Sequence, residues 1–247
     1  MAKEPGEFYV GYLSLPPRLK WTLRGLVLLL AALIALDAWL VASFQPQAGD
    51  GYWADAPAQF NGTLTRAPYP MLRVDDNGKV RTYVLISDEK RGAEAVLGDI
   101  PDGASVKIDG YEVKRAAVGL IQLAASDVSV TKAPAIAEDP REIHGRTELT
   151  GEIVDSKCWL GVMRPGEGHI HKACASLCIR GGIPPMFVVR GGASPQVYLL
   201  TTMDGGAVPP ASILEYIADP VRLSGLIEKR GDLYLFKADI STLARVE

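Results

Sequence analysis

The longest apolar stretch of the chain lies near its N-terminus. Residues 25–36 read GLVLLLAALIAL, and the stretch continues with little interruption to Phe44. About 20 apolar residues in a helix are enough to cross a hydrocarbon core of about 30 Å. The run is longer than the core of a usual signal peptide, and Ala42 and Ala48 offer only indifferent cleavage sites. We therefore expect an uncleaved transmembrane helix at residues 23–44.

The charges on either side of this segment predict its orientation. Asp50 and Asp55 follow the segment, whereas the basic residues before it are Lys3, Arg18, Lys20 and Arg24. Because basic flanks stay on the cytoplasmic side, residues 1–22 should form a cytoplasmic leader. The protein would then be a single-pass protein of a bacterial inner membrane, with its C-terminal domains in the oxidising periplasm.

Asp37 interrupts the apolar segment and has two interpretations. A carboxylate inside a membrane is costly, so it can mark contact with a partner helix. It can equally lie close to the interface, where the neighbouring Trp39 would act as an aromatic marker.

After this segment, the pattern of apolar and polar residues occurs twice. The first copy contains four segments in order: FNGTLTR (60–66), KVRTYVLIS (79–87), GAEAVLGDI (92–100) and the strand pair at 105–125. The second copy has the matching segments in the same order: LTGEIVD (149–155), PQVYLLTT (195–202), ASILEYIAD (211–219) and the strand pair at 220–238. The strand segments alternate apolar and polar residues, and the third segment of each copy has helical character. A period near 100 residues indicates domain duplication, since solenoid repeats are shorter.

Four or five strands with one helix before the last pair are typical of a small OB-like barrel. The fold class is therefore mainly β, with an N-terminal transmembrane helix and two tandem OB-like barrels, each carrying a short helix. We place the first barrel at residues 55–130, a Pro- and Ala-rich linker at 131–146 and the second barrel at 147–247. His144 should be an exposed linker histidine.

The two copies differ most at residues 156–185, an insert in the second barrel. This insert holds all the cysteines of the chain, Cys158, Cys174 and Cys178, together with His169 and His171. HIHKACASLCIRGG predicts a short helix that ends at Gly181-Gly182. His171, Cys174 and Cys178 would share one helical face, and Ile170, Ala173 and Leu177 would pack on the barrel.

Three kinds of chemistry fit the insert. First, Cys158 can form a disulfide with Cys174 or Cys178, worth about 3 kcal/mol, which leaves one thiol over. Second, the three thiolates with His169 or His171 can bind copper or zinc, although the spacing C-x15-C-x3-C matches no zinc finger. Third, Cys174 or Cys178 can be a redox-active thiol whose pKa is lowered by Lys172, Arg180 and the imidazoles.

The insert also resembles part of a known group of sequences. It is similar to uncharacterised bacterial membrane-anchored or secreted proteins that carry the pattern DSKC…CAxxCxxGG. The matching residues are Gly151, Val154, Asp155, Cys158, Cys174, Cys178, Gly181 and Gly182. The resemblance covers about 90 residues of the second copy. It implies an OB-like, periplasmic protein and brings no established activity.

Composition narrows the class of function. The net charge is −3, and Lys and Arg are not concentrated along any segment after the apolar stretch, so nucleic acid is not an expected partner. No nucleophilic triad or phosphate-binding loop is present. We expect a non-enzymatic accessory or assembly protein, with a disulfide-stapled insert, that supports a membrane or periplasmic partner such as a respiratory complex. The alternative is a copper- or zinc-binding or thiol-redox protein.

Overall fold

The computed structural model describes residues 16–44 and 51–246, apart from residues 116, 162 and 193 and the side chains of 125–127. The chain divides into two compact units, residues 1–47 and 48–247. Residues 1–15 of the predicted leader (1–22) lie outside the described residues, and so does Ala48, one of the two positions where a signal peptide could be cleaved in the competing interpretation.

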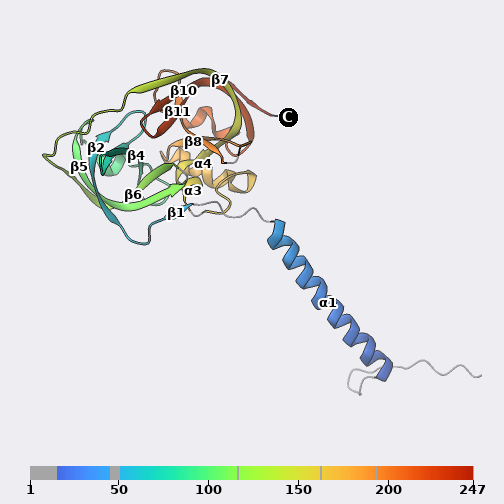
Figure 1. Ribbon diagram of the computed structural model, residues 1–247. Coiled ribbons are helices and arrows are strands. Elements are labelled where there is room, and N and C mark those ends of the chain that lie inside the picture. The colour runs from blue at the N-terminus through green and yellow to red at the C-terminus, as the bar shows by residue number, and fades with distance from the viewer. Residues whose placement is uncertain (1–15, 45–50, 116, 162, 193, 247) are drawn as a thin grey trace, which may run out of the picture. The chain divides into compact units, whose positions relative to one another are not determined.

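The described residues of the first unit form the helix α1 (Pro17–Phe44), drawn in blue in Figure 1. At 1.5 Å per residue its 28 residues span about 42 Å. None of its side chains is buried, and it is long and apolar enough to cross a membrane by length and composition. Helix α1 begins at Pro17, six positions before the predicted start, because proline is well accommodated in the first turn of a helix. Asp37 is exposed on it.

The second unit begins with a closed five-stranded barrel (Figure 1). Its strands are β2 (Ala58–Thr65), β3 (Met71–Asp76), β4 (Lys79–Ile86), β5 (Ser105–Arg115) and β6 (Val118–Val130). A short strand, β1 (Tyr52–Trp53), pairs with β5, and helix α2 (Glu94–Leu97) lies between β4 and β5.

A second closed barrel follows. Its strands are β7 (Arg141–Asp155), β8 (Pro185–Val189), β9 (Gln196–Thr202), β10 (Pro220–Arg230) and β11 (Leu233–Arg245). Both barrels have the strand order 1-2-3-5-4-1, in which strands 3 and 5 run parallel. This is the order of the OB fold, so the predicted duplication and fold class are confirmed. The segment ASILEYIAD forms two 3₁₀ turns, η2 (Pro210–Ser212) and η3 (Leu214–Tyr216), in place of an α-helix.

Equivalent glycines mark the first strand of each barrel. A Cβ on Gly62 would lie 2.2 Å from the carbonyl oxygen of Arg73, and one on Gly151 would lie 2.4 Å from that of Val188. At both positions the neighbouring strand approaches the backbone too closely for a side chain. The Gly that opens each copy in the sequence is therefore required by the tight closure of a small barrel.

The second barrel starts earlier than its sequence pattern indicates. Strand β7 begins at Arg141, inside the segment predicted as a linker, and pairs with β10 as far as Arg230. His144 lies in this strand and is exposed, 3.9 Å from Glu142. The insert follows β7 and forms α3 (Ser156–Leu160), the 3₁₀ turn η1 (His169–His171) and α4 (Lys172–Arg180).

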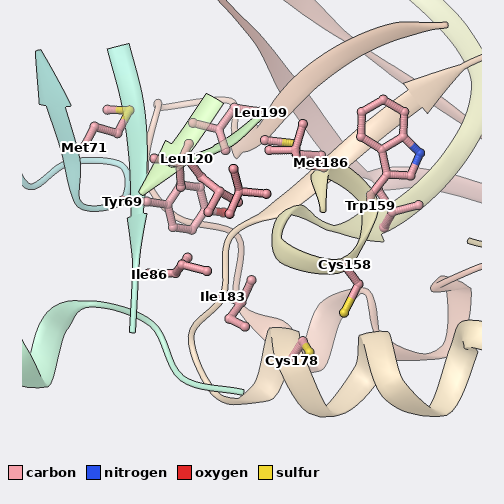
Figure 2. Close-up of a cluster of buried hydrophobic side chains, with 14 of the residues drawn as sticks. Tyr69, Met71, Ile86, Leu120, Cys158, Trp159, Cys178, Ile183, Met186 and Leu199 are labelled. Atoms are coloured by element: carbon pink, nitrogen blue, oxygen red, sulfur yellow. The ribbon is translucent and has the colours of Figure 1, made fainter. Parts of the chain in front are cut away.

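Buried apolar side chains form a core in each barrel and a third cluster shared by the two barrels. Figure 2 shows this shared cluster, in which Tyr69 and Ile86 of the first barrel meet Met186 and Leu199 of the second. The Tyr69 hydroxyl donates to the carbonyl oxygen of Leu200 at 2.9 Å. Cys158 and Cys178 lie at the edge of the same cluster, so the cysteines are placed where the barrels meet.

Candidate metal centre

The three cysteines come from two short helices of the insert. Cys158 lies in α3, whereas Cys174 and Cys178 lie one turn apart on α4. Cys158 and Cys178 are buried and Cys174 is half-buried. Figure 2 shows the side chain of Cys158 directed toward α4, the helix that carries Cys178. The predicted convergence of the thiols is present.

Asp155 links the start of α3 to His171. Its backbone is extended, and its Oδ1 accepts a hydrogen bond from the backbone N–H of Cys158 at 2.9 Å, which caps the helix. Its Oδ2 lies 3.1 Å from Nε2 of His171. Both side chains are buried, so the carboxylate fixes the orientation of Cys158 and of the imidazole at the same time.

Potential ligand atoms therefore gather in two overlapping groups. One group contains Cys158, His171 and Cys174, and the other contains Asp155, Cys158 and Cys178. Within each group the ligand atoms lie within 4.8 Å of one another. Cys158 belongs to both groups and is the centre of the cluster.

The predicted disulfide is not present in the structure, since Cys158, Cys174 and Cys178 are all free thiols. The sulfur atoms are held by polar contacts in place of a covalent bond. The Cys158 sulfur lies within 4.8 Å of the Cys174 sulfur and of the Cys178 sulfur. The predicted arrangement of one bridged pair with one thiol left over is replaced by three thiols that share one site.

His169 does not join the thiols. It is exposed, and its Nδ1 lies 3.4 Å from Oδ1 of Asp219 on the barrel wall. The packing face of α4 also differs from the prediction. Ile170, Ala173 and Leu177 are exposed, whereas Ala175 and Ile179 are buried. Ala173 and Leu177 lie in α4 itself, after the 3₁₀ turn η1, so this apolar stripe faces solvent although its residues share one side of the helix.

The cations next to the thiols come from residues that the sequence pattern did not indicate. Lys172 is bound to Asp219 at 2.8 Å, and Arg180 is exposed. Lys90, from the loop after β4 in the first barrel, instead donates from Nζ to the Cys174 sulfur at 2.8 Å and to the Cys178 sulfur at 3.8 Å. No local signal could have identified Lys90, because 84 positions separate it from Cys174.

Backbone contacts hold the Lys90 loop against the insert. The N–H of Gly92 donates to the carbonyl oxygen of Gly181 at 2.8 Å. A Cβ on Gly181 would lie 1.8 Å from the carbonyl oxygen of Lys90. Buried Lys157 adds a further connection, since its Nζ donates to the carbonyl oxygens of Ser87 and Glu89 at 3.2 and 2.6 Å. Gly181 was predicted as a helix stop, and the structure shows that it also lets the two barrels approach.

The surroundings shift the pKa values of Cys158 and Cys178 in opposite directions. The hydrogen bond with Cys158 lowers the pKa of Cys178, and Lys90 acts in the same direction. The same hydrogen bond, together with burial, raises the pKa of Cys158. Burial lowers the pKa of Lys157, whereas the hydrogen bond to Cys174 raises the pKa of Lys90. The pair therefore shares a proton, with Cys178 as the preferred thiolate.

A half-open pocket of about 630 Å³ borders the cluster. Trp53 and Met163 form apolar parts of its wall, and Lys90 and Cys174 also line it. An ion or a small reagent can therefore reach Cys174 from solvent. The chemistry available to this site is coordination of a soft or borderline metal ion, or oxidation of its thiols.

Comparison of this chain with protein-family models, with curated proteins and with solved structures gave no match. The assignment of the site therefore rests on its geometry.

Proposed function

We propose that the second barrel binds one thiophilic metal ion, copper or zinc, through Cys158, Cys174, Cys178 and His171. The observation that supports this most directly is the pair of ligand groups that share Cys158, one with His171 and Cys174 and the other with Asp155 and Cys178. Sulfur and imidazole ligands are typical of zinc and copper sites.

The surroundings of His171 support the same proposal. Histidine ligands of metals usually contact a carboxylate through the ring nitrogen that does not bind the metal, which fixes the ring orientation. Asp155 makes such a contact with His171 at 3.1 Å and also caps the helix that carries Cys158. One buried carboxylate therefore helps to orient two of the four proposed ligands, Cys158 and His171.

Metal titration of the purified chain tests this proposal. We expect one Zn²⁺ or Cu⁺ per chain, with all three thiols protected from alkylation. Replacement of Cys158, Cys174 or Cys178 by Ser, or His171→Ala, removes a direct ligand. Each change should weaken binding by more than the roughly 10–100-fold that loss of an outer-shell partner costs.

His169→Ala is the matched control, because this histidine lies in the same turn and contacts Asp219. It should leave the affinity unchanged. Circular dichroism of each variant checks that the barrels remain folded. Wild-type protein that binds neither ion, or folded cysteine variants with unchanged affinity, would refute the metal site.

A thiol-redox function is the second candidate. The closeness of the Cys158 and Cys178 sulfurs, within 4.8 Å, and the lowered pKa of Cys178 favour it, because the thiolate is the nucleophile in thiol–disulfide exchange. In the same titration, a thiol pair that oxidises reversibly and no bound metal would support this alternative.

We also propose a location and a cellular role. Helix α1 anchors the chain in a bacterial inner membrane, with the basic N-terminal side in the cytoplasm and both barrels in the periplasm. The protein serves a membrane or periplasmic partner, such as a respiratory complex, as an accessory or assembly factor. Asp37 is the proposed contact with a partner helix.

A further inference from the structure

The position of Lys90 deepens the proposed metal site. We propose that Lys90 is an outer-shell partner of the bound metal, so that the two barrels build the site jointly. This inference rests on the proposed metal-binding function. It assigns to the first barrel a role that its own sequence does not suggest.

The first argument is the geometry of the ammonium group. Nζ of Lys90 lies 2.8 Å from the sulfur of Cys174 and 3.8 Å from that of Cys178. A metal-bound thiolate keeps lone pairs that accept hydrogen bonds. Lys90 can therefore stay in place when Cys174 and Cys178 coordinate a metal, and it acts through these ligands.

The second argument is that the contact is built into the fold. The Lys90 loop is fixed by the Gly92–Gly181 hydrogen bond and by Lys157, which donates to the carbonyl oxygens of Ser87 and Glu89. The approach is so close that Gly181 has no room for a Cβ next to the carbonyl oxygen of Lys90. A lysine on an unconstrained surface loop would not be placed in this way.

The test compares Zn²⁺ affinity among variants of the full chain by competition with a chromophoric chelator. Lys90→Met keeps the length of the side chain and removes its charge. It should weaken Zn²⁺ binding about 10–100-fold, as expected for an outer-shell partner. Lys90→Arg restores the charge and should bind nearly as tightly as wild type. Lys132→Met, an exposed lysine after β6, is the matched control and should have no effect.

Apo-protein melting is measured in parallel, because a purely structural role for Lys90 would lower the melting temperature without changing Zn²⁺ affinity in the folded protein. That result, or equal affinity of Lys90→Met and wild type, would overturn the inference and leave the metal site intact. No metal binding at all would overturn the proposed function itself.

Discussion

Single charged residues connect the insert to the barrel that carries it. Asp219, which directly precedes β10, is buried and contacts Lys172 of α4 at 2.8 Å and Arg245 of β11 at 2.9 Å. Burial by itself would raise the pKa of this carboxyl, but the hydrogen bonds from Lys172 and Arg245 hold it below its usual value. Asp219 thus stabilises the position of α4, the helix that carries Cys174 and Cys178.

This lowered pKa predicts an acid dependence of stability. A carboxylate with a depressed folded pKa contributes stability above its unfolded pKa of about 4, and this contribution is lost as the pH falls through the folded value. Asp219→Asn should therefore be less stable than wild type at pH 7, by about 1 kcal/mol because both partners are partly exposed.

Urea unfolding of the full chain in detergent at pH 7 and at several acidic pH values measures this difference. The two curves should converge as the pH falls below about 4. Asp99→Asn, at an exposed position after α2, is the control for removal of one carboxylate. A constant difference between Asp219→Asn and wild type at every pH would contradict the electrostatic explanation.

At the scale of elements, α4 has one face toward the barrel and another toward solvent. Ile179 is 1% exposed and belongs to the core of the second barrel, whereas Leu177, two positions earlier, is 51% exposed. The sequence predicted the opposite role for Leu177. This short helix carries apolar residues on both of its faces, so the hydrophobic pattern alone does not identify the buried face.

The pair Ile179→Ala and Leu177→Ala distinguishes the two faces. Ile179→Ala leaves a cavity in the core and should cost about 2–5 kcal/mol of unfolding free energy. Leu177→Ala should change it by less than about 0.5 kcal/mol, as for other surface substitutions. Chemical denaturation of both variants measures the difference, and equal losses would show that Leu177 is buried in solution.

At the scale of the whole molecule, the membrane orientation is the main prediction. In intact spheroplasts, protease added from outside should digest residues 48–247, because basic residues at the N-terminal end of α1 favour a cytoplasmic N-terminus. Replacing Arg18, Lys20 and Arg24 by Gln should reduce the digested fraction. Complete protection of the wild-type domain, or a mature N-terminus near Ala48, would contradict the proposed topology.

The two barrels form one compact unit. Only those parts of the site that depend on neighbouring residues in the sequence were predictable. Local signals located the apolar helix, the duplication and the cysteine–histidine insert, because each depends on neighbouring residues. Lys90 and the Gly92–Gly181 contact depend on docking between segments far apart in the chain, for which the sequence has no local pattern. The disulfide was expected from compartment and spacing, but spacing does not specify where side chains point.

The sequence by itself determined the apolar helix, the two OB-like barrels and the identity of the reactive residues. Burial of one face of a strand requires apolar and polar residues to alternate, and this alternation can be recognised in the sequence. The apolar helix is recognised by its continuous run of apolar residues. Only the tertiary structure decided which residues meet. It separated His169 from the thiols, brought His171 to Asp155, and placed a lysine of the first barrel on the cysteines of the second. These contacts depend on distances of a few ångströms between distant segments, which only the packed fold defines.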